Sequence, residues 1–343
     1  MHLFLMDTQP LGSTGMKTSE IALGCTSFGD PDWRDIGWIL DEEESTEIIE
    51  HAIDLGVNYF DTANRYSFGE SERILGNVLS EHDREQFVVG TKVFTQMDPD
   101  NPNSGGLSRK AIEGEIEHSL GRLGMETIDI YQIHRWDYET PIDVTLSTLT
   151  DVVHRGQARH VGASTMWAHQ LFDAIRMSEQ DGYESFAVMQ NLYNLVYREE
   201  EREMLPFCQR EGMAVTPWSP LAGGLLARPL EDLEATERGE RMSELERGRL
   251  QRYLNAGGEE INRRVQELAE EKGVSMAQIA LAWQLHKEWV DVPIVGATKK
   301  EHLEDAVEAT EIDLRESDIE YLEEPYEPVR TINRREHPNP REE

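Results

Sequence analysis

The stretch Val57-Asn58-Tyr59-Phe60-Asp61-Thr62-Ala63-Asn64-Arg65-Tyr66 joins a short apolar run to a series of polar and ionisable side chains. The run Val57–Phe60 is typical of a parallel strand that is buried on both faces. Asp61 and Tyr66 follow at the point where such a strand would end. In a (β/α)8 barrel, the groups that do chemistry gather at the carboxyl ends of the strands. The stretch therefore indicates both a fold class and the place where chemistry would occur.

The same pattern recurs along the chain, because further apolar runs alternate with longer stretches of helical periodicity. We predict seven more strands, over Ile21–Gly24, Phe87–Thr91, Ile128–Ile133, Arg159–Gly162, Phe186–Gln190, Met213–Thr216 and Val292–Val295. Helices are predicted over Glu43–Leu55, Arg109–Leu123, Ile142–His154, Ala168–Ser178, Glu200–Arg210, Glu259–Glu271 and Ser275–His286, with Ser108 and Ser275 as N-caps. The alternation predicts an α/β fold, and a closed (β/α)8 TIM barrel fits the strand count better than an open sheet.

Four segments fall outside this alternation. Thr8–Ser19, with glycines at its turns, is predicted to be a β-hairpin that closes the bottom of the barrel. Gln96–Gly106 is a loop rich in Pro, Asn and Gly, and Arg228–Gly258 is a charged insertion that could form a mobile lid. Extra loops and helices are expected at the C-terminus, where the tail 324–343 is predicted to be a surface arm.

The length of 343 residues suits a single barrel domain over residues 1–343, with a core over about residues 8–322. Two cysteines, Cys25 and Cys208, are too few for a disulfide framework, and Cys25 is expected to pack rather than to react. The chain has no apolar run of transmembrane length, and its first residues lack the basic region and cleavage site of a signal peptide. A cytoplasmic protein with no membrane partner is therefore expected.

The charge balance is strongly acidic, with 67 Asp and Glu against 33 Lys and Arg and a formal net charge of −34. Such a surface repels nucleic-acid phosphates and anionic lipids, so neither is an expected partner. Self-repulsion of the compact state is relieved by salt. Because only seven of the basic residues are lysine, we favour a halophilic protein with an acidic surface over an ordinary acidic one. A loss of stability in molar KCl would contradict this hypothesis.

Ionisable residues follow three consecutive predicted strands. Asp61 and Tyr66 follow the second strand, Lys92 the third and His134 the fourth. An ammonium near a phenol favours the phenolate, a carboxylate can hold the ammonium, and a neutral imidazole can orient a carbonyl oxygen. Together these groups would form a proton donor and an oxyanion site suited to carbonyl reduction.

The same residue types also occur in structural roles and in metal sites. A lone Asp after a strand is more often a cap, and a lone His more often a structural group, but convergence of four such residues by chance is much rarer. A metal-dependent hydrolase using Asp61 and His134 would leave the Lys92–Tyr66 pair without a role, so no metal is expected. The chain has no Gly-x-Gly-x-x-Gly fingerprint for a dinucleotide.

The residues around the second strand resemble a known family. Gly56–Ala63, with Tyr66 and Gly69-Glu70-Ser71-Glu72, is similar to the first signature of the aldo-keto reductases. Further similar stretches are Leu11–Ser19, Gln157–Ser164 and Thr216–Leu225, and the resemblance extends to about Leu322. These motifs most resemble those of the branch that includes bacterial reductases and voltage-gated potassium channel beta subunits.

The resemblance implies an NADP-dependent oxidoreductase, with NAD as the alternative cofactor, that reduces aldehydes or ketones by hydride transfer. Tyr66 would be the general acid, Lys92 would lower its pKa and pair with Asp61, and His134 would position the carbonyl. Ser164 and Gln190 would bind the nicotinamide carboxamide, and Trp218 would stack on its ring. Backbone amides of Ser219, Leu221 and Gly223 would hold the pyrophosphate. The adenosine end would lie near Gly296, Thr298, His302 and Asp305, at a helix starting around Glu301. Gly24, Thr26, Asp61, Thr165, Pro220 and Lys300 are also implied as cofactor contacts.

Departures from the family pattern affect the cofactor prediction. Thr165 stands where many members have Asn, and His302 where Arg or Gln is common. Lys299, Lys300 and Arg228 could bind a 2′-phosphate, which favours NADP. The acidic residues nearby work against this choice; they are Glu301, Glu304, Asp305 and Glu308.

Substrate loops are expected over Phe28–Trp38, Phe94–Gly106 and Arg135–Tyr138, and at Trp167 and the Arg228–Gly258 insertion. Their tryptophans predict an apolar or sugar-stacking pocket for a small carbonyl or alcohol substrate. The main alternative is a cofactor-binding redox sensor or regulatory subunit with slow turnover. The sequence leaves open the natural substrate, the physiological direction and the oligomeric state.

Overall fold

The computed structural model describes residues 6–33, 37–235 and 244–331. Within these ranges, eight parallel strands form one sheet in the order β10-β3-β4-β5-β6-β7-β8-β9. The strands are β3 (Ala22–Gly24), β4 (Tyr59–Asp61), β5 (Val88–Val93), β6 (Ile128–Ile133), β7 (Ala158–Ser164), β8 (Val188–Gln190), β9 (Ala214–Val215) and β10 (Ile294–Gly296). Each lies within two residues of a predicted strand, because continuous apolar runs mark strands buried on both faces.

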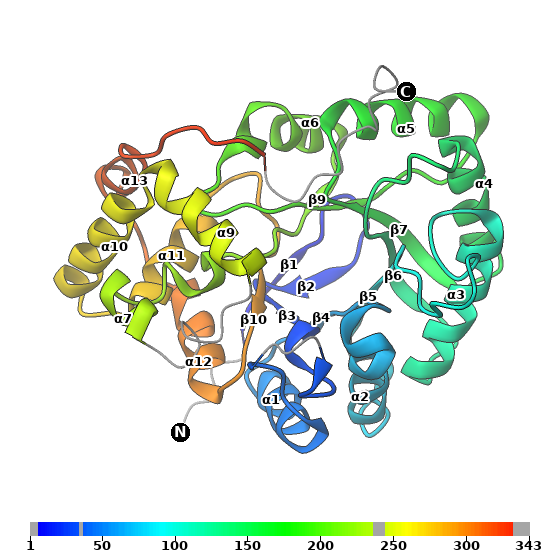
Figure 1. Ribbon diagram of the computed structural model, residues 1–343, viewed down its shortest axis with the longest axis horizontal. Coiled ribbons are helices and arrows are strands. Elements are labelled where there is room, and N and C mark those ends of the chain that lie inside the picture. Colours follow the sequence, from blue (N-terminus) through cyan, green and yellow to red (C-terminus); the bar gives the residue numbers. More distant parts are fainter. Residues whose placement is uncertain (1–5, 34–36, 236–243, 332–343) are drawn as a thin grey trace.

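The sheet closes on itself beyond β9. Trp218 forms a parallel bridge with Ile294, and the Ile294 amide donates to the Pro217 carbonyl at 2.8 Å. Figure 1 shows the helices as an outer ring around the strands. This arrangement confirms the predicted (β/α)8 barrel.

The outer helices are α1 (Glu42–Asp54), α2 (Glu70–Leu79), α3 (Arg109–Leu123), α4 (Ile142–His154), α5 (Ala168–Asp181), α6 (Met204–Glu211), α10 (Glu259–Lys272), α11 (Met276–Leu285), α12 (Lys300–Glu308) and α13 (Glu316–Glu323). Ser108 and Ser275 cap α3 and α11 as predicted, and each hydroxyl accepts a backbone N–H three residues later. No described helix is both long and apolar enough to cross a membrane.

Among the outer helices, α2 and α13 were not predicted, α12 was predicted only by its start near Glu301, and one predicted helix is interrupted. The predicted helix Glu200–Arg210 consists of a 3-10 turn, Glu199–Arg202, followed by α6. The break is at Glu203, whose φ of −140° is not helical. It places Pro206 in the first turn of α6, where a proline is tolerated because its missing N–H needs no partner.

The hairpin of β1 (Thr8–Pro10) and β2 (Lys17–Ser19) is antiparallel, as predicted. Leu11, in its turn, is fully buried in a small apolar cluster with Tyr59, Val88 and Ile130. In Figure 1 the hairpin lies across the centre of the ring of helices. It therefore closes the end of the barrel opposite the carboxyl ends of the strands.

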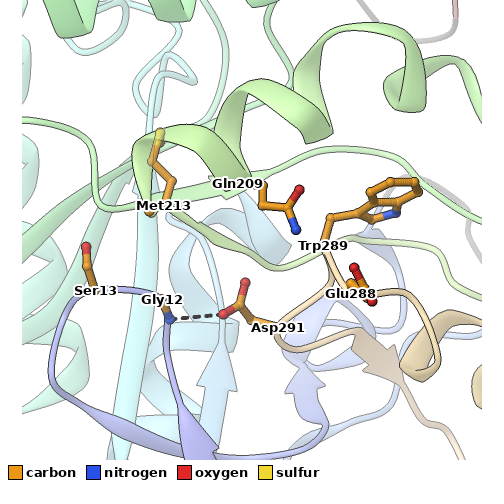
Figure 2. A pocket seen from close by; sticks show the side chains of 8 residues that line it. Gly12, Ser13, Gln209, Met213, Glu288, Trp289 and Asp291 are labelled. Atoms are coloured by element: carbon orange, nitrogen blue, oxygen red, sulfur yellow. Dashed lines mark hydrogen bonds between the residues drawn. The ribbon is translucent and has the colours of Figure 1, made fainter.

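A shallow cavity of about 320 Å³ lies beside the hairpin at this bottom end, lined by Gly12, Ser13, Gln209, Gly212, Met213, Glu288, Trp289 and Asp291. Figure 2 shows this cavity and labels all of these residues except Gly212. The Asp291 carboxylate accepts the backbone N–H of Gly12 at 3.0 Å and of Val215 at 2.8 Å. One side chain thus joins the hairpin to β9 and to the segment before β10.

The Arg228–Gly258 insertion contains α7 (Leu230–Ala235), α9 (Glu244–Tyr253) and a π-helical turn, η7 (Leu254–Gly258); its residues 236–243 lie outside the described ranges. Its mobility stays a prediction. The tail is described as far as Thr331, and this part binds the barrel rather than extending from it. The Tyr326 hydroxyl donates to Glu199 at 2.8 Å, and the Glu327 amide donates to the Ala256 carbonyl at 3.1 Å.

Candidate active site

Lys92 and Asp61 form a buried ion pair at the mouth of the barrel. The Lys92 Nζ donates to Asp61 Oδ2 at 2.6 Å and to the Thr62 carbonyl at 2.8 Å. Both side chains are almost completely buried. The same Nζ lies 5.3 Å from the centre of the Tyr66 ring, and the Tyr66 ring meets the His134 ring edge to face with centres 6.0 Å apart. The four predicted catalytic residues therefore lie together.

The electrostatics keep Lys92 charged and His134 neutral. Burial alone would lower the pKa of Lys92, but the charges of Asp61 and Tyr66 and the hydrogen bonds that Lys92 donates to them raise it above its ordinary value. Burial lowers the pKa of His134 well below its ordinary value, and the positive charges of Arg135, Lys92 and Arg65 add to the shift. The His134 Nδ1 is buried and has no hydrogen-bond partner among the described residues. A neutral ring with an unpaired nitrogen can bind a ligand oxygen or its hydrogen.

The second oxygen of Asp61 is held from two strands, β6 and β8, that do not pair with β4. Gln190 Nε2 donates to Asp61 Oδ1 at 2.9 Å, and Gln132 Nε2 does so at 3.3 Å. A Cβ at Gly162 would lie only 2.9 Å from the Gln132 side chain, so glycine makes room for Gln132 in the barrel interior. Gln132 was not predicted as a site residue, because a glutamine inside a strand gives no signal of its direction.

Ser164 and Thr165 end β7 beside this group. The Ser164 hydroxyl donates to the Gln190 carbonyl at 2.8 Å and lies 3.1 Å from the Thr165 hydroxyl. The Thr165 amide donates to the side chain of Asn191 at 2.8 Å, which in turn donates to the buried Glu200 at 2.7 Å. Thr165 has a φ of +51°, which a non-glycine residue rarely adopts, and these bonds hold it there.

A cavity of about 640 Å³ opens at the mouth, and most of the predicted site residues line it. These are Gly24, Thr26, Asp61, Tyr66, His134, Ser164, Gln190, Trp218, Ser219, Pro220, Leu221, Gly223, Gly296, His302 and Asp305. The predicted residues Lys92, Thr165, Thr298 and Lys300 are not among its lining. Lys92 lies behind Tyr66, whereas Lys300 is exposed and pairs with Glu47 of α1 at 3.0 Å.

Two basic side chains, Arg228 and Arg249, line the cavity beside residues predicted to bind the cofactor. Arg228 lines the cavity with His302 and Asp305, and its Nε is buried with no partner among the described residues. Burial, followed by the charges of Lys299 and Arg228, lowers the pKa of His302, while burial raises the pKa of Asp305. Arg249 of α9 stacks over the Trp218 ring at 5.5 Å. These unpaired cations, together with the polar side chains of Ser164 and Gln190 in the same lining, fit a nicotinamide dinucleotide.

Five non-glycine residues in the described ranges have positive φ, and all of them lie in loops at the mouth: Ser67, Phe68, Thr165, Ser219 and Ala222. They follow β4, β7 and β9, at the carboxyl ends of those strands. Backbone strain of this kind persists where the surrounding structure holds it, and it tends to occur at binding sites. The strain therefore marks the same end of the barrel as the ionisable residues.

Two other chemistries considered from the sequence find little support in this geometry. Cys25 is fully buried, and burial raises the pKa of its thiol, so it packs against the strands instead of facing the cavity. Asp61 is engaged by an ammonium and two amides, and within the described residues no three His, Cys, Asp or Glu side chains are grouped as metal ligands.

Three arginines that line the cavity were not predicted individually as site residues: Arg65, Arg135 and Arg249. Arg135 and Arg249 do lie within predicted substrate loops, Arg135–Tyr138 and the Arg228–Gly258 insertion. Arg65 and Arg135 each adjoin a predicted catalytic residue after a strand, so the rule that found Tyr66 and His134 could have found them. Arg249 lies in the insertion, where no strand end indicates its position.

Comparisons with known proteins identify the family of this chain. Residues 20–327 match the model of the aldo/keto reductase family. A Schizosaccharomyces pombe protein named "Putative aryl-alcohol dehydrogenase" is 43% identical, over 93% of this chain and 95% of the relative. Versiconal hemiacetal acetate reductase of Aspergillus parasiticus is 41% identical, over 94% of this chain and 98% of the relative. An aldo-keto reductase of Alternaria alternata is 38% identical, over 92% and 90%. These relatives are fungal, so the branch resemblance and the halophile hypothesis stay predictions. The barrel, its mouth and these matches show that the chain belongs to the aldo/keto reductase family.

Proposed function

We propose that this protein is an NADP-dependent reductase of aldehydes or ketones in which Tyr66 is the general acid. One observation carries the proposal: a fully buried, charged Lys92 is held by Asp61 and lies directly beside Tyr66, with a neutral His134 against the same ring. The family uses nicotinamide cofactors, and the reductases among the relatives support carbonyl reduction.

Each residue of the group has a distinct role in this proposal. NADPH would supply the hydride to the carbonyl carbon. His134, kept neutral by burial, orients the carbonyl oxygen toward the phenol. Tyr66 gives its proton to that oxygen as negative charge develops there, and the Lys92 ammonium stabilises the phenolate that remains. Asp61 holds Lys92 in place, and its remaining oxygen fixes Gln190 of β8.

The choice of NADP over NAD rests on Arg228 and Lys299. The charges of both residues lower the pKa of His302, which lines the cavity, and Arg228 carries an unpaired buried Nε. A guanidinium in this state suits the 2′-phosphate that NADP has and NAD lacks. We expect Arg228→Gln to weaken NADPH binding about tenfold or more while changing NADH binding far less.

The test is NADPH oxidation with a panel of aldehydes and ketones, with cofactor affinity measured separately by fluorescence titration. Turnover of several carbonyl compounds supports the reductase. Binding of NADPH without turnover would favour a redox sensor or regulatory subunit, and failure to bind either NADPH or NADH would overturn the proposal.

The acidic composition supports a second part of the proposal, that the enzyme works at high salt. The midpoint of thermal unfolding should rise between low salt and molar KCl, because counter-ions screen the self-repulsion. A falling midpoint would contradict it.

A further inference from the structure

Four arginines line the mouth cavity of a chain whose net charge is −34: Arg65, Arg135, Arg228 and Arg249. Most other arginines in the described residues pair with Asp or Glu, as Arg73 and Arg122 do. None of these four forms an ion pair with a described carboxylate. An acidic protein that gathers unpaired guanidinium groups in one cavity creates a local positive potential there.

The four arginines divide into two groups by their position. Arg228 lies with His302, and Arg249 stacks on Trp218, so this pair faces the proposed cofactor. Arg65 immediately precedes Tyr66 after β4, and Arg135 immediately follows His134 after β6. Both lie close enough to His134 for their charges to act on its ring. This second group therefore adjoins the reacting carbonyl.

The second group is held under electrostatic stress. The Nε of Arg65 is buried and has no described hydrogen-bond partner. Arg135 is fixed by a bond from its Nη1 to the His134 carbonyl at 2.8 Å. Burial, and then the charge of Arg65, lowers the pKa of Arg135 to about 10, and Arg249 adds a weaker effect of the same sign. Arg65 and Arg135 are therefore two like charges that remain close together at neutral pH. Repulsion of this kind is relieved when an anion binds between the cations.

We propose that Arg65 and Arg135 bind an anionic substituent of the substrate, a carboxylate or a phosphate monoester, so that the preferred substrate is an acidic aldehyde or ketone. The proposal rests on the proposed reductase function and names its substrate class. Trp33 and Trp38 line the same cavity and offer an apolar wall for the body of such a substrate. Guanidinium groups bind both anions through paired, charge-assisted hydrogen bonds.

The experiment compares kcat/KM for 4-carboxybenzaldehyde and for its neutral methyl ester, with 4-formylphenyl phosphate as a third substrate, all at one KCl concentration. We expect the wild type to prefer at least one of the two anions over the ester by about 10- to 100-fold. Whichever anion is preferred identifies the source of the charge. Arg65→Gln and Arg135→Gln should each lower that preference about tenfold, and Arg65→Lys should restore part of it.

Arg210→Gln is the matched control, because this arginine is exposed on α6, far from the cavity, and its loss also removes one positive charge. It should leave the preference unchanged. Equal kcat/KM values for anions and ester in the wild type, or an unchanged preference in both cavity variants, would overturn the inference while leaving the reductase intact. Weaker NADPH binding in the variants with no change in preference would also overturn it, because the arginines would then serve the cofactor.

Absence of turnover with all three substrates would instead count against the reductase. In that event calorimetry with 4-(hydroxymethyl)benzoate and its methyl ester still tests the anion site. Tighter binding of the acid, lost in Arg65→Gln, supports the inference, and equal binding refutes it.

Discussion

Asp61 at the mouth of the barrel and Asp291 at its bottom both accept several hydrogen bonds, but from different kinds of donor. Asp61 is held by the side chains of Lys92, Gln190 and Gln132. Asp291 accepts the backbone N–H groups of Gly12 and Val215. A carboxylate that holds side chains can position reactive groups, whereas one that holds backbone fixes chain segments. The same residue type thus supports chemistry at one end and the fold at the other.

The largest expected effect is at the mouth, where Tyr66→Phe removes the proposed proton donor. We expect kcat for carbonyl reduction to fall about 10²- to 10⁴-fold. NADPH affinity and the thermal midpoint should change little, because Tyr66 is only half-buried and its ring is retained. Steady-state kinetics measure kcat, fluorescence titration measures the NADPH affinity, and thermal unfolding measures the midpoint. A fully active Tyr66→Phe variant would contradict the assignment of the barrel mouth as the catalytic end.

Lys92→Met sharpens the comparison, because it should damage both chemistry and stability. It leaves the buried Asp61 carboxylate without its ammonium partner, which costs about 3–5 kcal/mol of unfolding free energy. Urea unfolding measures this loss, and kcat should fall as well. The double variant Lys92→Met with Asp61→Asn should lose less unfolding free energy than the sum of the losses in the two single variants. Strict additivity would show that the pair does not act as a unit.

At the bottom, Asp291→Asn should affect stability alone. Its amide can accept one of the two backbone N–H groups, so the other loses its acceptor at a cost of about 1–3 kcal/mol. The urea midpoint should fall, with kcat for a good aldehyde unchanged within about twofold. A large drop in kcat would break the division between the two ends.

The smallest expected effect is a loss of stability as the pH falls. Because the folded-state pKa of His134 lies below its unfolded value, the unfolded chain binds more protons as pH falls below about 6.5, and stability falls with it. This loss continues until the folded pKa is reached. Between pH 6.5 and 5.5 the wild type should lose about 1 kcal/mol more than His134→Asn, measured by urea unfolding. Parallel losses in the two proteins would mean that His134 takes up its proton over the same pH range in the folded and the unfolded chain.

Asp291, at the bottom of the barrel, contributes a pH dependence of stability with the opposite sign. Burial raises the folded-state pKa of Asp291 above its unfolded value, although the N–H groups of Val215 and Gly12 act against the shift. Its contribution to stability is therefore fully present below the unfolded pKa and is lost as pH rises through the folded one.

The strands and the positions of Asp61, Tyr66, Lys92 and His134 could be predicted from the sequence because both follow from local rules. A buried parallel strand is a continuous apolar run, and the residues after it must lie at the mouth. The capping serines Ser108 and Ser275 were predictable for the same reason, since a cap acts within one turn.

Contacts between distant segments could not be predicted in this way. Gln132 reaches Asp61 only because the neighbouring strand carries Gly162, and nothing in either residue's local sequence indicates that meeting. The pairing of Lys300 with Glu47 depends on how α12 packs beside α1. Arg249 reaches Trp218 from an insertion whose course no periodicity specifies.

The left-handed backbone at the mouth has a consequence for how this enzyme could evolve. Glycine adopts positive φ without the strain that Phe68, Thr165 and Ala222 bear, at some cost in unfolded-chain entropy, so glycine at such sites could raise stability by up to about 1 kcal/mol each. Selection for heat resistance alone would therefore find its gains in the loops that shape the cavity. Lineages that kept these residues would have kept turnover in preference to durability, and a laboratory screen for thermostable variants should monitor activity at these positions first.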